Sequence, residues 1–517
     1  MRFPVTHSAG EAGTAVEATS ALSCSVDTFD GQVTVEWDPD AKVTPLGQLP
    51  FFIEFLKIGG RFETWIDDCP LFYKARNAPK KVDVLGSLFL SILSGHSRYK
   101  HLAALRNDSV NSRLLGMSKI VSEDSARRGL KRINETQGIE WLQTHLQQSV
   151  EPLLNQPWIL DCDVTVKPLY GHQESAVKGY NPTKRGRPSQ TYHTYMMANL
   201  RLVLDVDIQP GNHSASSYSL PGLTALLSRL PTTCRPQFVR GDCDWGTDHV
   251  MSELEAMDVH YLFKLKQSQN VKKLIYKHHC EGEWEPLRDQ WEAKESKLQL
   301  SGWEKERRVI VVRRQLTRDE TLVIAPTTPE PQQTTLGFIE GPEDMQAFQY
   351  SVLITSLPGD TVSVFQHYRD RSDCENIFDE IKNHWGWGGF TTRDIKSCQL
   401  IAKIVALIYN WWTLFVRLAN PDGRHIEALS SRPQLLSSIA QLTESGRKKI
   451  LKITHQHSRS NFWQQALVLL SGLFIKIKRV APQQPATCGW QALMQYIIDK
   501  MIPKSSAQPK SVALEAG

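Results

Sequence analysis

Two kinds of hydrophobic pattern divide this chain. From Leu49 to about Leu154 apolar residues recur three and four positions apart, the spacing of one buried helix face. The clearest repeats are Phe51, Phe52, Phe55 and Leu56, and then Leu85, Leu88, Phe89 and Ile92. The pattern predicts a mainly helical region over residues 31–155, with one short strand at Val33–Trp37. Residues 1–30 are rich in Ser, Thr, Ala and Gly, and we expect them to form a disordered tail.

From Trp158 onward, short apolar runs replace the helical spacing. We predict strands over residues 159–166, 192–206, 237–240, 259–265 and 350–355, and helices over residues 219–230 and 247–257. The run over residues 192–206 contains two strand-like halves with a kink at Ala198–Asn199. Strands that alternate with helices indicate an α/β sheet.

A segment of different character interrupts this α/β pattern between Lys266 and Gln349. Val309–Val312 and Thr321–Ile324 have the composition of strands, and Pro- and Gln-rich loops separate them. We therefore predict a mainly β insertion domain over residues 266–349. After the insertion, residues 394–418 and 433–455 have helical patterns, and the last fifteen or so residues have the composition of a loose tail.

The most apolar stretch of the chain is Leu400–Ala419. Lys403, Asn410 and Arg417 interrupt it, which is typical of a buried core helix and not of a membrane span. The nine cysteines contain no Cys-x2-Cys pair, so we expect reduced thiols and a cytoplasmic location. These features, with 41% hydrophobic and 22% charged residues, describe a chain long enough for about three domains.

The net charge of +5 is only mildly basic, but the positive charges are clustered. Clustered cations favour contact with phosphates, whereas a single cluster is more often a solvated face. The four clusters are Arg127, Arg128, Lys131 and Arg132; Lys184, Arg185 and Arg187; Lys305, Arg307, Arg308, Arg313 and Arg314; and Arg447, Lys448, Lys449 and Lys452.

The segment Tyr368–Lys382 has the most informative spacing in the chain. Tyr368, Arg371, Glu375 and Lys382 have offsets of 0, +3, +7 and +14, which on one continuous helix fall within an arc of about 60°. A carboxylate between cations on a fixed face suits a metal-bound phosphodiester. The same pattern can also arise on an exposed helix that carries i,i+4 ion pairs.

The Tyr-x2-Arg-x3-Glu-x6-Lys spacing resembles the signature of cut-and-paste insertion-sequence transposases. Further blocks occur in the order that this family uses. They are Leu160-Asp-Cys-Asp-Val-Thr165, Gly179–Ser189, Arg240-Gly-Asp-Cys-Asp-Trp-Gly246 and Arg424-His-Ile-Glu-Ala-Leu-Ser430. The resemblance implies an α/β fold with a ribonuclease-H-like mixed sheet flanked by helices. It also implies an insertion between the second Asp and the Glu.

The resemblance implies three catalytic carboxylates, which we assign to Asp163, Asp242 and Glu375. Together they would bind two Mg²⁺ or Mn²⁺ ions, since hard oxygen ligands select these metals. Each assignment has a nearby alternative. The alternatives are Asp161 for Asp163, Asp244 for Asp242, and Asp379 for Glu375. The sequence Asp-Cys-Asp-Trp-Gly, which begins at the second assigned carboxylate Asp242, departs from the family's Asp-x-Gly-Phe-like pattern.

The resemblance also assigns residues to DNA. Tyr368, Arg371 and Lys382 would contact phosphates, and the loop that carries Lys184, Arg185 and Arg187 would contact the backbone. Trp303, or Trp291, is a candidate to stack on a flipped base, although core packing is the commoner role of a tryptophan. Asn107–Ile133 is compatible with a helix-turn-helix or with a plain helical packing module.

The implied division of the chain is as follows: a tail (1–30), a helical DNA-binding region (31–155), the catalytic core in two parts (156–265 and 350–420), the insertion (266–349) and a helical C-terminal region (421–517). The implied function is cleavage and strand transfer of an insertion sequence. The protein would bind terminal inverted repeats of double-stranded DNA as a homodimer, with a hairpin intermediate. Two alternatives remain, a ribonuclease-H-fold structure-specific nuclease and an inactive transposase-derived DNA-binding protein.

Overall fold

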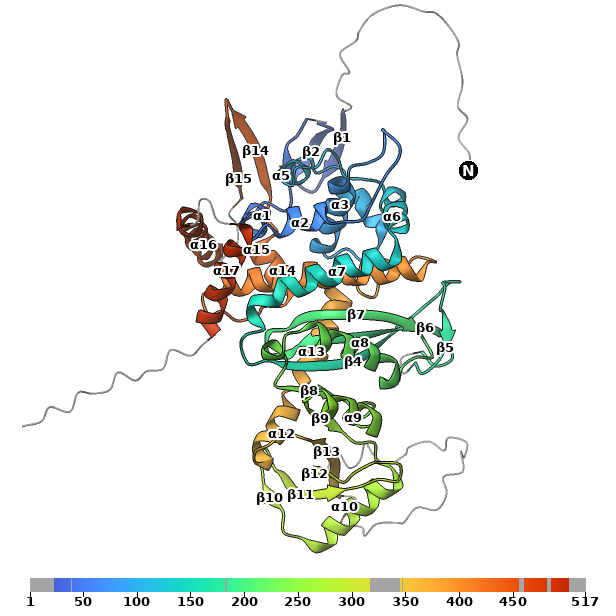
Figure 1. Cartoon of the computed structure of the whole chain (residues 1–517). Helices are drawn as coiled ribbons and strands as arrows, with labels where there is room; N and C mark the ends of the chain where they lie inside the picture. The colour runs from blue at the N-terminus through green and yellow to red at the C-terminus, as the bar shows by residue number, and fades with distance from the viewer. Residues whose placement is uncertain are drawn as a thin grey trace, which may run out of the picture.

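The computed structural model describes residues 23–501, except residues 39, 182–183, 317–344, 346, 455–459 and 481–484. Helices gather at one end of the molecule, and a twisted sheet runs from beneath them to the other end (Figure 1). The helices of the first region are α1 (Leu49–Ile58), α2 (Arg61–Asp67), α3 (Lys81–Leu93), α4 (Leu102–Leu105), α5 (Ser109–Leu114), α6 (Glu123–Arg132) and α7 (Glu135–Val150).

The helical starts follow ordinary capping chemistry. Asp108 accepts hydrogen bonds from the backbone N–H groups at the start of α5, and Ser122 does the same for α6. Eight residues, 115–122, separate α5 from α6, whereas a helix-turn-helix joins its helices by three or four residues. Helix α6 contacts α3 and α14, so the packing-module alternative describes this segment better than the helix-turn-helix.

Part of the segment expected to be a disordered tail forms a strand. Strand β1 (Ser23–Thr28) pairs antiparallel with β2 (Gly31–Glu36), and the predicted strand at Val33–Trp37 overlaps β2. Cross-strand pairing of Val26 with Val33 supplies the apolar contact that the Ser- and Thr-rich composition concealed.

Helix α14 (Ile395–Ala419) is the central helix of the helical layer, and nearly all of its residues are buried. It is the one helix of the described chain that is long and apolar enough to cross a membrane, but its apolar window is entirely inside the protein. The prediction of a buried core helix is therefore confirmed. Helices α16 (Ser460–Val480) and α17 (Ala486–Met501) pack beside it.

Of the helix predicted over residues 433–455, residues 433–435 are helical, residues 436–454 are not, and residue 455 lies outside the described residues. Helix α15 (Ala428–Leu435) is short, and a hairpin follows, made of β14 (Ala440–Ser445) and β15 (Lys448–Ile453). Gly446 has φ 57° in the turn between the two strands, a conformation that glycine adopts without strain. Lys448, Ile450 and Lys452 lie on the same face of the strand, so the period is two residues and the helical prediction was wrong.

Ten strands form the main sheet, in the order β10-β11-β12-β13-β9-β8-β4-β6-β5, with β7 also paired to β6. Strand β4 runs antiparallel to β6 and parallel to β8, and β8 runs parallel to β9. The strand bounds are β4 (Ile159–Pro168), β5 (Val177–Lys178), β6 (Pro188–Met197), β7 (Leu202–Pro210), β8 (Phe238–Gly241) and β9 (His260–Lys264). The kink predicted at Ala198–Asn199 is a 3-10 turn that reverses the chain between β6 and β7.

The strands of the predicted insertion extend the core sheet. Helix α10 (Gln269–Glu281) is followed by β10 (Glu285–Pro286), β11 (Trp291–Leu298) and β12 (Arg307–Gln315). Strand β12 pairs with β13 (Phe348–Thr355), and β13 pairs with β9. The four consecutive apolar residues Val309–Val312 of β12 bury alternately against the two faces of this continuous sheet, which explains the arrangement. The strand predicted at Thr321–Ile324 lies outside the described residues.

Helix α14 covers the free edge of β7. Asn410 accepts from the Val203 N–H at 2.8 Å and donates to the Val203 carbonyl at 2.7 Å. Gln399 makes the equivalent pair of bonds with Ile208 N–H and Val206 C=O. Eleven helical residues and five strand residues both span about 16 Å, so the two amides match two points on the edge. Asn410 lies in the apolar stretch and Gln399 lies beside it. Their side-chain amides thus provide hydrogen-bond partners for the otherwise unpaired edge of β7.

Helices cover both faces of the central sheet. Helices α8 (Ser216–Arg229) and α9 (Asp248–Ala256) lie on one face, and α13 (Ser372–His384) lies on the other. Asp161 and Asp163 point toward α13, because residues two apart on a strand share a face. Strand β13 leads into α12 (Thr361–Arg369) and then into α13, so this part of the chain returns to the sheet beside β4 and β8.

Candidate active site

The predicted Tyr368–Lys382 helix is broken. Helix α12 ends at Arg369 and α13 begins at Ser372, so Tyr368 and Lys382 lie on different helices. At the junction the Arg371 N–H bonds to the Tyr368 carbonyl, and the Cys374 N–H bonds to the Arg371 carbonyl. Both bonds span three residues, so the chain tightens there. The expectation of one straight 60° arc was therefore wrong, and the residues are brought together by a turn instead.

Arg371 lies at the centre of the predicted carboxylates. Its Nη2 is 3.5 Å from Asp163 Oδ1, and its Nη1 is 4.0 Å from Glu375 Oε1. Burial disfavours the charged guanidinium, but nearby Asp163, Tyr368 and Asp242 outweigh that effect and raise its pKa. The three residues assigned from the sequence thus surround one arginine. Asp163 and Glu375 form ion pairs with Arg371, and the negative charge of Asp242 helps to raise the pKa of Arg371.

The environments of the two paired carboxylates differ. The side chain of Asp163 is 22% exposed, whereas that of Glu375 is 74% exposed. Burial, reinforced by the charge of Asp242, raises the pKa of Asp163 to about 6, although Arg371 and Lys382 oppose the rise. The cations already present therefore do not fully compensate the buried carboxylate, and further positive charge would stabilise its ionised form.

The alternative carboxylate on β4 is engaged elsewhere. Asp161 is 1% exposed and accepts two hydrogen bonds from Arg240, at 2.6 and 2.7 Å. Arg240 is 2% exposed and also donates to the His367 carbonyl at the end of α12. This bidentate pair joins β4, β8 and α12 beneath the site. Sequence reasoning missed Arg240, although an arginine in the apolar strand Phe238-Val-Arg240 signals a buried acidic partner.

The other two alternatives also have separate partners. Asp244 lies 2.5 Å from Lys266 Nζ, and its backbone N–H donates to Asp242 Oδ1 at 2.9 Å. Asp379 is exposed and accepts from Asn383. Each alternative is therefore directed to its own partner, whereas Arg371 contacts Asp163 and Glu375.

The described residues contain no group of three or more His, Cys, Asp and Glu side chains arranged to hold a metal ion. The donor chemistry still suits a hard cation, because Asp163, Asp242 and Glu375 offer carboxylate oxygens. In this arrangement the Arg371 guanidinium occupies the position between Asp163 and Glu375. A metal would have to replace the guanidinium there.

Tyr368 and Lys382 lie at the edge of the same group. Burial raises the pKa of Tyr368 to about 12, so the phenol remains protonated and able to donate. Burial lowers the pKa of Lys382, while Asp163 and Asp379 raise it in opposition. Arg371 and Lys382 thus interact with Asp163, Tyr368 lies in the field of Arg371 and Asp242, and Glu375 joins the group through its pair with Arg371.

A buried carboxylate behind the site holds α13 in place. Glu380 accepts from His425 Nε2 at 2.9 Å, from the Ala428 N–H at 2.9 Å and from Trp385 Nε1 at 3.3 Å. Although burial opposes it, these donors keep the pKa of Glu380 below its usual value. The block at Arg424–Ser430 was noted in the sequence, but its partner Glu380 was not. The acidic residue five positions after Glu375 on a half-apolar helix was the available signal.

The other residues assigned to DNA lie away from this group. Lys184 and Arg187 stack on the exposed ring of Tyr170, at 5.0 and 4.3 Å from its centroid, in the loop beyond the end of β4. Pro168, beside that loop, is five strand residues or about 17 Å from Asp163. The neighbouring Arg185 is exposed. Trp303 is half-buried against the core and lies 5.6 Å from Arg307.

The basic clusters differ in how much of their charge is available. Arg307 pairs with Asp248 and Glu255, and the other cations of that cluster mostly pair with acids on β11 and α9. Arg127 pairs with Glu123 in its own helix. The insertion cluster consists of Lys305, Arg307, Arg308, Arg313 and Arg314. Ion pairs therefore neutralise much of its charge, which the sequence alone did not reveal.

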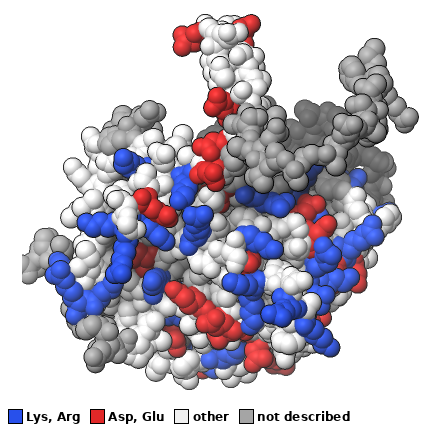
Figure 2. Space-filling view, turned by 90° about the horizontal axis from the view of Figure 1, so that it is seen from above, with Lys and Arg blue, Asp and Glu red and all other residues white. Residues whose placement is uncertain are grey.

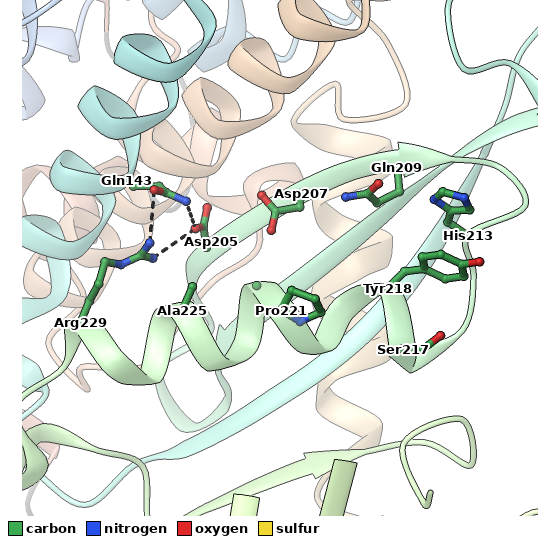
Figure 3. Close-up of a pocket in the computed structure, with 11 residues that line it drawn as sticks. Gln143, Asp205, Asp207, Gln209, His213, Ser217, Tyr218, Pro221, Ala225 and Arg229 are labelled. Atoms are coloured by element: carbon green, nitrogen blue, oxygen red, sulfur yellow. Dashed lines mark hydrogen bonds and ion pairs between the residues drawn. The ribbon is translucent and has the colours of Figure 1, made fainter. Parts of the chain in front are cut away.

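A cavity of about 490 Å³ lies on the opposite face of the sheet, between β7, α7 and α8 (Figure 3). Asp205 on its floor is bonded by Gln143, Arg229 and the fully buried Lys403. Lys403 also reaches Asp207 at 3.3 Å. The acids are thus largely satisfied by the protein's own donors, and the sheet separates the cavity from Asp163.

A comparison of the chain with known proteins identifies a matching family. Residues 73–473, more than three quarters of the chain, match the family described as transposase DDE domain group 1. None of the curated proteins matches the chain. Among solved structures the chain is similar to a cryo-EM structure of the piggyBac transposase synaptic complex with hairpin DNA. The identity is 10% and the TM-score 0.36, over 91% of this chain and 88% of that chain, a level that carries no argument about function.

Proposed function

This chain belongs to the transposase family with a DDE domain of group 1, and we propose that it cleaves and transfers DNA strands of an insertion sequence. Asp163, Asp242 and Glu375 are the catalytic carboxylates of this proposal. The observation that carries it is the position of Arg371, which pairs with Asp163 and Glu375 and lies in the field of Asp242. Three acids from β4, β8 and α13 thus share one cationic centre.

We infer that the five strands β7-β6-β4-β8-β9 form a ribonuclease-H-like core. Support comes from the strand directions, since β7, β6 and β4 are antiparallel neighbours and β4, β8 and β9 are parallel ones. Asp163 lies within the central strand of this set, and Asp242 directly follows its parallel neighbour β8. Carboxylates on adjacent parallel strands meet on one side of the sheet, as two-site metal binding requires.

Two Mg²⁺ or Mn²⁺ ions are the proposed cofactors, held by Asp163, Asp242 and Glu375. Such ions, when bound, activate the attacking oxygen and stabilise the leaving oxygen of a phosphodiester. The raised pKa of Asp163 supports the proposal, because a partly uncompensated buried carboxylate favours an added cation. Arg371 would leave its position between Asp163 and Glu375 on metal binding, and its guanidinium would become free for a phosphate.

The remaining signature residues supply donors in this proposal. Arg371 can engage a phosphate with two parallel N–H groups, whereas Lys382 acts as a point charge. Tyr368 stays protonated at neutral pH and can donate its O–H to a phosphate oxygen. Arg371 is 12% exposed and Tyr368 is half-buried, so partial exclusion of water would strengthen their interactions with a phosphate, whereas Lys382 is exposed.

The proposed substrates are terminal inverted repeats and target DNA, with a homodimer joining two ends. The direct test is cleavage, with Mg²⁺, of duplexes that carry the ends of the encoding element. Glu375→Gln is expected to abolish the cut, because it removes one carboxylate without changing side-chain size. Asp379→Asn, on the same helix, is the matched control and should retain cleavage.

The outcomes separate the proposal from its alternatives. Cleavage at the element boundary by wild type and Asp379→Asn only would support a transposase with this site. Cleavage of branched DNA regardless of sequence would indicate a structure-specific nuclease. Specific binding without cleavage would indicate an inactive DNA-binding protein, and cleavage by Glu375→Gln would overturn the site.

A further inference from the structure

The β14–β15 hairpin stands out from the helical end of the molecule (Figure 1). Its base is anchored, since Ala440 and Gln441 pair with Thr44 and Val43 of β3 (Val43–Thr44). The Thr454 N–H also bonds to the Ile439 carbonyl where the hairpin closes. The turn around Gly446 and the residues on either side of it are exposed. The hairpin is therefore an arm with a fixed base and a solvated tip.

This arm carries concentrated positive charge along its second strand. Arg447, Lys448, Lys449 and Lys452 are all exposed, and within the described part of the chain none of them makes an ion pair or side-chain hydrogen bond. This contrasts with the insertion cluster, in which Arg307 and Arg313 are paired with acids.

The one acid of the hairpin is engaged by the body of the protein. Glu444 lies 3.3 Å from Lys42 Nζ and 4.0 Å from Arg113 Nη1. Lys and Arg side chains are spread over this end of the molecule and outnumber the acidic ones there (Figure 2). The arm thus extends a basic surface instead of opposing one.

The two faces of the ribbon differ. Leu442 and Ala440 are buried, so this face packs on the body. The other face presents Lys448, Ile450 and Lys452, which alternate along β15 and lie opposite Ser445, Thr443 and Gln441 of β14. Lys448 and Lys452 are about 13 Å apart along the strand. One outward face therefore combines two cations, hydrogen-bonding groups and the exposed apolar side chain of Ile450.

We propose that the β14–β15 hairpin is a DNA-binding arm whose basic ribbon enters the major groove of duplex DNA. The major groove is about 12 Å wide and admits a two-stranded β-ribbon. Lys448, Lys452 and the turn residue Arg447 reach phosphates at the rims of the groove, while Ser445, Thr443 and Gln441 face base edges. The inference rests on the proposed function, because that function makes duplex DNA the partner of this basic surface.

The test measures binding alone, in EDTA, so that it does not depend on cleavage. The variant Arg447→Ala/Lys448→Ala/Lys452→Ala is compared with wild type on a 40-base-pair duplex across a series of salt concentrations. Three lost phosphate contacts should reduce the slope of log K against log salt by about 2.7, at about 0.9 per contact. Affinity at 0.1 M salt should fall on the order of 100-fold.

Two control proteins isolate the effect of position from that of charge. The lower-sheet control is Lys273→Ala/Arg288→Ala/Lys297→Ala. It removes three exposed cations, on α10, between β10 and β11, and on β11, and it should keep the wild-type slope. Arg447→Lys/Lys448→Arg/Lys452→Arg keeps the charge of the arm and should also keep the slope. Thermal melting of each variant establishes that it is folded.

A groove-specific readout completes the design. Methylation of guanine N7, which faces the major groove, should be reduced in the wild-type complex and restored by the alanine variant. A wild-type slope in the alanine variant, with wild type still bound to DNA, would overturn the arm and leave the proposed function intact. Absence of duplex binding by wild type would overturn both. Equal loss in the lower-sheet control would show that only net charge matters and would also refute the arm.

Discussion

Asp163→Asn should stabilise the metal-free protein at neutral pH. The pKa of Asp163 is raised from 3.8 to about 6, so the folded state holds the proton more tightly than the unfolded chain does. Ionisation of this buried carboxyl therefore opposes folding. The opposition is absent below about pH 3.8, grows as the pH rises, and is complete above about pH 6.

The size of the effect follows from that pKa. Each tenfold change in proton affinity is worth 1.36 kcal/mol, so the rise to about 6 corresponds to about 3 kcal/mol. Asn resembles the neutral carboxyl in shape and carries no charge. For a chain of 517 residues the entropy of unfolding is about 1 kcal/mol/K, so the melting temperature should rise by about 3 °C at pH 8.

The assay is urea unfolding in EDTA at pH 4 and pH 8, with cleavage measured separately in Mg²⁺. We expect Asp163→Asn to be more stable than wild type at pH 8, nearly equal at pH 4, and inactive at both. Asp379→Asn, an exposed change on α13, should alter stability little at either pH. A gain that is the same at pH 4 and pH 8, or a loss at pH 8, would refute the reasoning that buried charge destabilises this site.

Three further predictions concern buried charges. Arg240→Met should lower the free energy of unfolding by about 3–5 kcal/mol, because it leaves the Asp161 carboxylate buried without its partner. Adding Asp161→Leu to this variant should restore most of the lost stability. A double variant that stays as unstable as Arg240→Met would contradict the pairing. Lys403→Met should cost a similar amount by leaving Asp205 without its buried cation, measured by urea unfolding, and a neutral result would refute it. Glu380→Gln should destabilise by about 1–3 kcal/mol at pH 7. Since the pKa of Glu380 is lowered on folding, the difference from wild type should shrink as the pH falls toward 4, and a difference that grows instead would contradict this.

Much of the sheet could be predicted from the sequence, because its strands are short apolar runs between turn residues. The predicted strand at 159–166 became β4, and the run at 350–355 became β13. The errors have physical causes. The place of the insertion strands in the sheet was not predicted, because sequence gives no signal of which strand pairs with which, and the register of β12 with β13 is a long-range choice. The helix predicted over 433–455 failed because a glycine turn and a two-residue period were not weighed against helical spacing.

The candidate site shows the same limits. The spacing of Tyr368, Arg371, Glu375 and Lys382 assumed a straight helix, whereas the structure joins these residues through a turn at Arg371. The junction at Arg371 depends on a tertiary interaction with Asp163, which no local pattern encodes. Asp161 and Asp163 could likewise be distinguished only from the position of Arg240, which pairs with Asp161. Local periodicity therefore supplied the candidates, and long-range pairing distinguished their environments.

The continuous sheet also affects how this protein can change over generations. The chain leaves the core after β9 and returns as β13, which pairs directly with β9 before it leads to α12 and α13. Strands β10 and β11 lie farther out, at the rim of the sheet. Lengthening or shortening the hairpin there would alter only the rim, because the pairing of Leu353 with Lys264 would still fix where the next helix begins. Lineages of this fold could thus vary the insertion in size while Glu375 keeps its distance from Asp163.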